Sequence, residues 1–465
     1  MHRLAGSDAG FLFIETLAQT SVCVDLVELA EPVPGVAPLS VHSLYKWFED
    51  HLAVLEPLRW RLEQVPLQIH HPLWIEDPDF DLSYHIREHT LPSPGGRDEI
   101  EAFHAACMPE VLDLRHPLWR VTLVNGLDNG RRQALLFQIH HSLADGAVIL
   151  HTFTKLFHPL PQGVDPTTRA PASPPPRRSK IFTQALKDQA RAWKDIPAMY
   201  RETKQRFAAA DARREEGHVP VPKSMGDAPA TVLNRPGPIR RTCAHTTVPI
   251  EDLQQVRSNV GCTLNDVALA MVGGGLRRYL GERDQLPTKS LVANVPVSGD
   301  PPGTQPRSWG NRFANFFVFL ATDIEDPCER LSAIAAGTAE AKVLLETQGH
   351  FTLTEWLERI PPFIGARAAR WMIDRNAKDT EKSGYNVLIS NVRFMDDDLA
   401  ICEIPVEAIH LTGPIGDDAG LNITVVGYKG TLHITIDASP VAVDDPRSLI
   451  EDIAQSLKEL LACTA

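Results

Sequence analysis

The chain lacks any long apolar run. Within its 465 residues no stretch of about 18 uncharged apolar residues occurs, although a membrane-spanning helix needs that length. The N-terminal stretch carries Asp8 and Glu15 among its apolar residues, so it resembles neither a signal peptide nor a membrane span. We therefore expect a cytoplasmic protein.

Paired cysteines and an excess of positive charge are lacking too. The seven cysteines are scattered and nowhere spaced as CxxC, which disfavours a disulfide framework or a zinc cage and predicts free thiols. The net charge of −13 excludes a general nucleic-acid binder, because the duplex is itself anionic. No GxSxG sequence occurs, which removes the nucleophile elbow of a serine hydrolase.

Two proline-rich breaks divide the chain. The composition, 43% hydrophobic and 23% charged, is typical of a globular protein, and the length indicates two or three domains. The breaks begin near Leu160 and end near Arg241, which predicts lobes at 1–165 and 237–465 joined by 166–236. Each block mixes strand-like runs with helical ones, so we expect an α/β protein with mixed sheets and flanking helices.

The connecting segment contains a basic, helix-like stretch from Ile181 to Glu216. Pro197 is predicted to kink or split this helix. Between positions 171 and 217 there are eleven lysines and arginines against six acidic residues. Two interpretations stand: an amphipathic helix on an anionic membrane surface, or a helix packed across both lobes with a solvated basic face. The second is favoured.

Two histidine pairs are the most conspicuous polar features of the apolar runs. One pair, His140 and His141, ends the stretch LLFQIHHSLADG. Strand alternation puts the two rings on opposite faces, so His141 should continue the apolar row in the drier environment and His140 should lie on the more polar face. The other pair, His70 and His71 in QIHHPLW, is interpreted as structural, in an irregular exposed segment.

The residues after the first pair predict a rigid turn. Asp145 is placed to cap the helix that follows, and Gly146 allows a tight turn or the close approach of a ligand. The spacing HHxxxD supplies at most one histidine and one carboxylate on a shared face, so a metal site is disfavoured. A neutral imidazole held this rigidly fits a general base.

The whole motif HHSLADG resembles that of the CoA-dependent acyltransferase superfamily, which includes chloramphenicol acetyltransferase and peptide-synthetase condensation domains. Further motifs resemble the bacterial wax ester synthase/diacylglycerol acyltransferase family. They occur in the order SDAGFLFIET, WIEDPDFDLSYH, VLDLRHPLW, LNDVALA, VPVSGD, GNRFANFF, NVLISNV and GPIGDDAGLNITVVGYKGTLHITID. They cover nearly the whole chain outside the linker.

This resemblance implies a two-lobed fold like that of chloramphenicol acetyltransferase, and transfer of a fatty acyl group from acyl-CoA to diacylglycerol or a long-chain alcohol. It places His140, His141 and Asp145 in the catalytic motif, with His141 as the base and Asp145 orienting the motif through a salt bridge or backbone hydrogen bonds. Acyl-CoA would be a co-substrate, with no metal or resident cofactor. It also suggests a bacterial source, with peripheral placement on the inner membrane or lipid bodies.

The sequence also offers candidate substrate-binding residues in the second block, 237–465. Asn265, Ser390 and Asn391 are candidates, with Gly146, for binding the carbonyl or the acceptor oxygens, but turn and cap roles are equally open for the polar three. Two departures from the family's pattern, Gly299-Asp300 and Arg393-Phe394, bear on substrate preference.

Other conspicuous residues are interpreted as structural. Trp119 should be a packing anchor. Asn422 and Thr424 lie in a predicted hairpin that turns at Lys429-Gly430 and buries one face. The remaining functional alternatives are a non-catalytic lipid-binding protein of the same fold, an acyltransferase for a different hydroxyl acceptor, and a condensation module. We expect no attached carrier domain, which disfavours the last.

Overall fold

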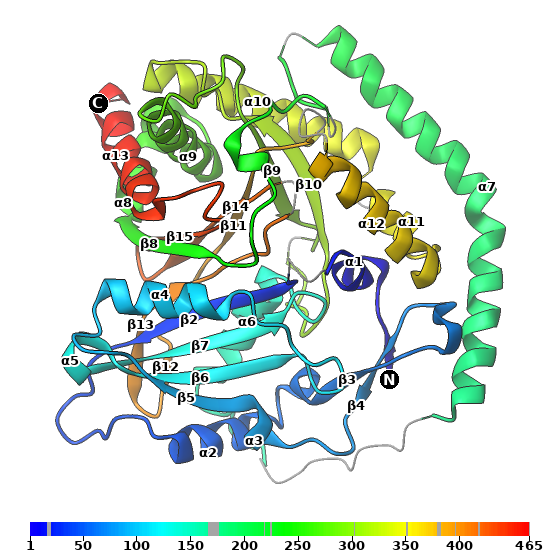
Figure 1. The fold of residues 1–465 in the computed structure, drawn as a ribbon, viewed down its shortest axis with the longest axis vertical. Coiled ribbons are helices and arrows are strands. Elements are labelled where there is room, and N and C mark those ends of the chain that lie inside the picture. The colour runs from blue at the N-terminus through cyan, green and yellow to red at the C-terminus, as the bar shows by residue number, and fades with distance from the viewer. Residues whose placement is uncertain are drawn as a thin grey trace.

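The computed structural model describes residues 1–15, 20–165, 176–217, 219–223, 226–301, 303–349, 352–378, 383–395, 397–416 and 419–464. Two lobes, each built on a six-stranded sheet, pack against each other, and one long helix runs along the side of both (Figure 1). This is the predicted two-lobed α/β arrangement. Residues 166–175, 218 and 224–225 of the predicted connecting segment 166–236 lie outside the described residues.

The sheet of the first lobe has the strand order β12-β13-β2-β7-β6-β5. Its strands are β2 (Val22–Leu29), β5 (Ile86–Thr90), β6 (Trp119–Gly126), β7 (Arg132–His140), β12 (Ala400–Ile401) and β13 (Ile404–His410). All neighbours are antiparallel except β5 and β6. The strands β12 and β13 come from the C-terminal block, so the first lobe is completed by a crossover that a division by sequence position does not anticipate.

The sheet of the second lobe has the order β10-β9-β11-β14-β15-β8. Its strands are β8 (Thr242–Pro249), β9 (Val292–Ser298), β10 (Phe313–Phe319), β11 (Val387–Met395), β14 (Leu421–Tyr428) and β15 (Thr431–Ala438). The central strand β11 is parallel to both of its neighbours. The hairpin β14–β15 turns at Lys429 and Gly430, both with positive φ, as predicted. However, both of its faces are buried rather than one, because β14 and β15 lie inside the sheet with the first lobe on one side and helices on the other (Figure 1).

Helices cover the sheets and a small sheet lies near the N-terminus. The first lobe has α1 (Gly6–Ile14), α2 (Val41–His51), α3 (Leu82–His85), α4 (Arg97–Cys107), α5 (Leu127–Gly130) and α6 (Gly146–Leu156). The second has α8 (Ile250–Val260), α9 (Leu264–Gly281), α10 (Pro327–Gln348), α11 (Thr352–Leu357), α12 (Pro362–Lys378) and α13 (Pro446–Thr464). The small sheet has β1 (His2–Arg3), β4 (Leu73–Glu76) and β3 (Trp60–Glu63), and the 3-10 turns are Glu56–Arg59, Pro66–Gln68 and Val232–Asn234.

The helix α7 (Arg178–Glu216) is continuous through Pro197, so of the predicted kink or split the split is wrong, and Figure 1 shows the helix changing direction along its length. Contacts on both sides of the proline hold the helix in place. Gln189 donates to the carbonyl of Arg359 at 2.7 Å, and Trp356 donates to the hydroxyl of Thr203 at 3.1 Å. A long helix that is anchored before and after a proline stays helical across it despite one lost backbone hydrogen bond.

The inner face of α7 packs on both lobes. Ile181 and Ala185 join the small sheet in an apolar cluster, while Arg213 near the other end forms a salt bridge with Glu340 of α10. The interpretation of α7 as a helix packed across two lobes is therefore confirmed. In the part of the chain that the structure describes, no helix is long and apolar enough to cross a membrane.

One disulfide corrects the expectation that all cysteines are free. Cys328 at the start of α10 and Cys463 at the end of α13 are joined. They are 135 residues apart in sequence, and they meet because α10 and α13 pack side by side on α9. Spacing rules cannot detect a pair brought together by helix packing. Cys23, Cys107, Cys243, Cys262 and Cys402 are free thiols.

Candidate functional site

The motif HHSLADG forms a strand, a turn and a helix, as predicted. The strand β7 ends at His140, and α6 begins at Gly146. Asp145 is the N-cap residue: its Oδ1 accepts a hydrogen bond from the backbone nitrogen of Val148 at 3.0 Å, which satisfies a free donor of the first helical turn. The capping role predicted for Asp145 is therefore confirmed.

His140 is fully buried and its ring is occupied by local contacts. Its Nδ1 accepts from the backbone nitrogen of Ser142 at 3.0 Å. The proton of the neutral ring is therefore on Nε2, which lies 3.5 Å from a carboxylate oxygen of Glu15. Since its lone pair is already used, the His140 ring fixes the strand end and has no free nitrogen for a substrate proton.

The relative exposure of the two rings differs from the sequence expectation. His140 has 0% exposure, whereas His141 is half-buried. The prediction that His141 is the drier of the pair is wrong. The strand ends at His140, so His141 belongs to the turn and its environment is set by segments far away in sequence.

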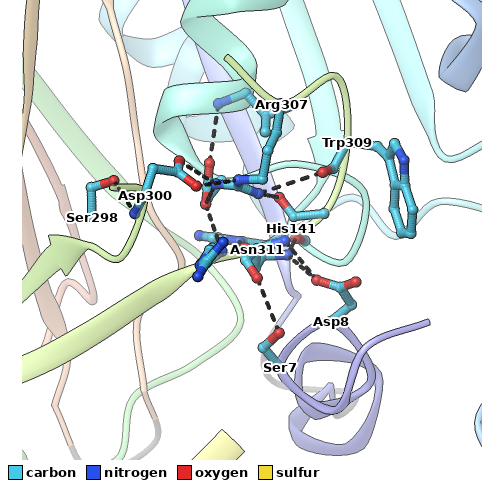
Figure 2. Close-up of polar contacts among 12 residues, drawn as sticks. Ser7, Asp8, His141, Ser298, Asp300, Arg307, Trp309 and Asn311 are labelled. Carbon is cyan, nitrogen blue, oxygen red and sulfur yellow. Dashed lines mark hydrogen bonds and ion pairs between the residues drawn. The ribbon is translucent and has the colours of Figure 1, made fainter. Parts of the chain in front are cut away.

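The imidazole of His141 is oriented by Asn311, as Figure 2 shows. Nδ1 of His141 lies 2.9 Å from Oδ1 of Asn311. The side-chain amide nitrogen of Asn311, Nδ2, donates to Asp8 Oδ1 at 2.8 Å and to the backbone carbonyl of His141 at 2.6 Å. The carbonyl of His141 can only accept, so the amide can have only one orientation. Oδ1 must then accept from Nδ1, and the free lone pair of His141 is on Nε2.

The surroundings of His141 keep the ring neutral. Phe11 of α1 stacks on it with ring centroids 4.0 Å apart and planes inclined by 12°. Burial lowers the pKa of His141, and this effect outweighs the opposing attraction of Asp145 and the hydrogen bond to Asn311. An imidazole with a lowered pKa is available as a base near neutral pH.

Asp8 connects α1 to the same network. Its carboxylate accepts from the backbone and side chain of Asn311, at 2.7 and 2.8 Å, and from the backbone nitrogen of Ala5 at 3.2 Å. Burial raises the pKa of Asp8 to about 7, and the hydrogen bonds from Asn311 oppose that rise. The first helix is therefore fixed against the turn that carries the catalytic motif.

A second network holds Asp145 from the other lobe. Its Oδ2 accepts from Arg307 Nη2 at 2.6 Å and from the backbone nitrogen of Arg312 at 3.0 Å. Asp300 also binds Arg307, at 2.8 Å to Nε and 3.0 Å to Nη2. The departure Gly299-Asp300 therefore contributes an acid that fixes the arginine, close to the motif (Figure 2).

Glycine is required where the two lobes meet beside the motif. Gly310 has φ +79°, and its backbone nitrogen donates to the carbonyl of Leu143 at 2.6 Å. A Cβ at this position would lie 3.3 Å from Asp8 Oδ2. The GN sequence thus combines a left-handed backbone that suits glycine with the amide that orients His141.

The other predicted site residues lie on β11 and at the start of α9. A Cβ on Gly146 would lie 3.1 Å from the side chain of Val392, so β11 passes close to the start of α6. Asn391 donates to the side chain of Asn265 at 3.3 Å, and Ser390 precedes Asn391 on the same strand. The structure therefore brings Asn265 and Asn391 together, and their substrate roles stay predictions. The side chains of Arg393 and Phe394 lie outside the described residues.

Residues interpreted as structural have buried, satisfied side chains. Trp119 is 2% exposed and donates to the carbonyl of Leu58 at 2.6 Å. Thr424 donates to Asn422 at 2.9 Å inside β14. The pair His70 and His71 is buried, at 7% and 0% exposure, so the prediction of an exposed segment is wrong. Proline-rich neighbours indicated a loop, but α7 and α11 cover that loop.

An apolar pocket lies on one side of the catalytic turn. Its enclosed space is about 20 Å³, roughly the room that one water molecule needs. Leu143 and Ala144 of the motif line it, along with residues of α6 and the segment before β3. Lys155 and His151 supply polar groups at its wall. The hollow is therefore an apolar surface beside the motif rather than a pocket of ligand size.

Three residues that position the motif were not identified from sequence: Asp8, Arg307 and Asn311. Asp8 lies within the motif SDAGFLFIET, and Asn311 lies within the motif GNRFANFF. The order of these motifs along the chain indicated a family but gave no contacts, because Asn311 lies 170 residues from His141 and 303 from Asp8.

Comparisons with known proteins agree with this architecture. The sequence model of the wax ester synthase/diacylglycerol acyltransferase catalytic domain matches residues 4–268, and that of the WS/DGAT C-terminal domain matches residues 309–461. Two putative diacylglycerol O-acyltransferases of Mycobacterium tuberculosis are similar. One is 32% identical, covering 97% of this chain and 93% of its own, and the other is 29% identical, covering 100% and 91%.

Solved structures show the same fold. A wax ester synthase/diacylglycerol acyltransferase from Marinobacter aquaeolei VT8 has 24% identity and a TM-score of 0.70, with 100% of each chain covered. The first condensation domain of a calcium-dependent antibiotic synthetase has 16% identity and a TM-score of 0.62, with 100% of this chain and 97% of the other covered.

The salt bridge to Asp145 predicts unequal effects of two substitutions. Arg307→Met removes the charged partner of a carboxylate that is only 10% exposed, so we expect a loss of about 1–3 kcal/mol in the free energy of unfolding. Asp300→Asn leaves the bond between Arg307 and Asp145 in place and should cost less. Thermal unfolding of both variants measures this, and equal melting temperatures would contradict the assignment.

Proposed function

The chain belongs to the wax ester synthase/diacylglycerol acyltransferase family, and on that premise we propose that it transfers a fatty acyl group from acyl-CoA to a hydroxyl of diacylglycerol, with His141 as the base. Long-chain alcohols are the second acceptor class, giving wax esters. The observation that carries the proposal is the fixed amide of Asn311, which leaves the free lone pair of His141 on Nε2.

The reaction follows from that lone pair. Nε2 of His141 removes the proton of the acceptor hydroxyl while its oxygen attacks the thioester carbonyl. The tetrahedral intermediate then expels the CoA thiolate as the carbon–sulfur bond breaks, and the protonated Nε2 returns its proton to sulfur. The proton taken from the alcohol thus ends on the thiol, and no resident cofactor takes part.

Asp145 and Asn311 position the base rather than touch the substrate. Asp145 caps α6 and holds Arg307, so the turn keeps its geometry while charge develops on His141. Asn265, Ser390 and Asn391 are the candidates for binding the carbonyl oxygen or the acceptor. What supports them is the approach of β11 to the start of α6 and the hydrogen bond between Asn391 and Asn265.

We propose that the apolar hollow beside Leu143 and Ala144 widens to admit a hydrocarbon chain of the substrate, because its present enclosed space of about 20 Å³ holds no more than a water molecule. Its lining is mostly apolar, and a bound chain there would also exclude water, which acyl transfer needs if hydrolysis of the thioester is to be avoided. We assign it to a hydrocarbon chain of the acyl donor or acceptor. A different hydroxyl acceptor, or lipid binding without catalysis, remains the competing function.

Removing the base should abolish most of the activity. His141→Ala is expected to lower kcat by about 10² to 10⁴, measured as CoA thiol release from palmitoyl-CoA with diacylglycerol, hexadecanol or a short alcohol supplied separately. His70→Ala, at the other histidine pair, is the matched control and should retain kcat. If the wild-type chain releases no thiol with any acceptor, it is a lipid-binding protein; if hexadecyl ester dominates the products, the order of acceptors is reversed.

The lowered pKa of His141 sets the pH dependence. The base acts when neutral, so kcat/KM should stay level as pH falls to 6.5 and decline only below it, about tenfold per pH unit. Initial rates across a pH series, corrected for uncatalysed thioester hydrolysis, measure the midpoint. A midpoint above 6.5 would contradict burial as the dominant influence on this imidazole.

We further propose that the outer side of α7 rests on an anionic lipid surface, where the acceptors are found. Four large side chains recur every seven residues on this helix: Leu186, Trp193, Tyr200 and Phe207. They are exposed by 53%, 52%, 60% and 41%, and a seven-residue spacing keeps them on one side of a helix. Exposed basic residues accompany them: Lys187, Arg191, Lys194, Arg201 and Lys204. Apolar side chains beside basic ones favour an anionic interface.

Vesicle binding tests this placement. The wild-type chain should sediment with phosphatidylglycerol vesicles and less with phosphatidylcholine vesicles, and added salt should weaken binding. The double variant Leu186→Gln/Trp193→Gln should reduce sedimentation, whereas Val260→Gln/Val343→Gln, at sites of 39% and 37% exposure on other helices, should not. Equal loss in both variants would overturn the assignment to α7.

A further inference from the structure

A group of buried imidazoles lies between the lobes, away from His141. Glu28 is on β2, His410 on β13 and His245 on β8, and these strands face each other across the junction of the two sheets (Figure 1). One potential ligand atom from each of the three residues lies within 4.8 Å of the other two. His410 Nε2 is 3.3 Å from Glu28 Oε1, and the rings of His245 and His410 have centroids 4.1 Å apart.

Several ring nitrogens in this group have no hydrogen-bond partner among the described residues. They are Nε2 of His245, Nδ1 of His410 and both ring nitrogens of His433. These three residues are only 9%, 2% and 3% exposed, so water does not readily satisfy them. Native proteins rarely leave so many buried polar atoms unpaired in one place, since each costs about 1–3 kcal/mol.

The neighbouring residues hold the group in position. Arg132 donates to Glu28 Oε2 at 3.0 Å, which leaves Oε1 directed toward His410. Glu101 accepts from the backbone nitrogen of His245 at 3.1 Å, and Arg97 donates to the backbone carbonyl of His245 at 2.7 Å. Outer contacts that orient a carboxylate and fix the backbone of a histidine are typical of metal sites.

We propose that Glu28, His245 and His410 bind one divalent transition ion of the zinc class, with His433 as the nearest further donor. The ring of His433 lies 5.4 Å from that of His410. Two imidazole nitrogens and one carboxylate oxygen suit Zn²⁺, whereas Mg²⁺ and Ca²⁺ prefer oxygen ligands alone. A tetrahedral site places ligand atoms about 3.4 Å apart, which small side-chain rotations from the present geometry achieve.

This ion would join the lobes and take no part in acyl transfer. On β2, Val22 pairs with His140 of the catalytic motif, and Glu28 is six residues further along the strand. At about 3.3 Å per residue, the two ends of β2 are separated by roughly 20 Å. The ligands come from both sheets, so binding would stabilise the packing of one lobe on the other. The inference is independent of the proposed function.

Zinc binding to the full chain, free of any histidine tag and first treated with a chelator, tests the proposal. We expect one Zn²⁺ per chain by calorimetric titration and a higher melting temperature with the ion bound. Glu28→Gln and His245→Gln should each weaken binding at least about tenfold. His85→Gln, which changes a buried histidine stacked on Trp119, is the matched control and should bind as the wild type does.

A measurement on the wild-type chain covers the case in which a variant fails to fold. X-ray absorption of the zinc-loaded protein should show two or three imidazole ligands and a carboxylate oxygen, with no sulfur. Absence of stoichiometric binding, binding that both variants retain, or coordination by sulfur would each overturn the proposal.

Discussion

The side-chain amide of Asn311 is the point through which the catalytic motif, the first helix and the second lobe are held together. It donates to Asp8 and to the carbonyl of His141 and accepts from the imidazole. Because the carbonyl of His141 can only accept, the amide has one orientation, and its oxygen accepts from the imidazole in a single pattern of protons. The tautomer of His141, and hence the nitrogen available to a substrate, follows from that pattern.

The same junction explains why the acids near the motif hold other residues in place and need not contact the substrate. Asp8 belongs to α1 and Asp145 to the motif itself, and each accepts a hydrogen bond from the backbone of residues 311–312, far away in sequence. Neither carboxylate has to reach a substrate to matter, because catalysis by a positioned base depends on small displacements of its ring. In this chain Asp300 adds a further acid behind Arg307, so the motif is held through two successive ion pairs.

The sequence predicted what local pattern determines. The end of β7, the cap of α6, the hairpin at Lys429-Gly430 and the two lobes follow from alternation, helix periodicity and turn chemistry. Contacts between distant parts of the sequence could not be predicted: Asn311 with His141, β13 with β2, and Cys328 with Cys463 unite residues 135 to 384 positions apart. The wrong predictions concern the exposure of His140 and His141, the exposure of His70 and His71, and a split in α7. They share this cause, because tertiary contacts set the surroundings of each.

The exchange of β13 into the first sheet has a consequence for how the protein is made. Val406 of β13 pairs with Leu29 of β2, so on the ribosome the edge of β2 stays open while about 380 further residues are added. At typical rates of synthesis this lasts on the order of tens of seconds. An unpaired strand edge invites pairing with other chains, so the nascent N-terminal half has a long period of exposure to aggregation and to chaperones before its own last strand arrives.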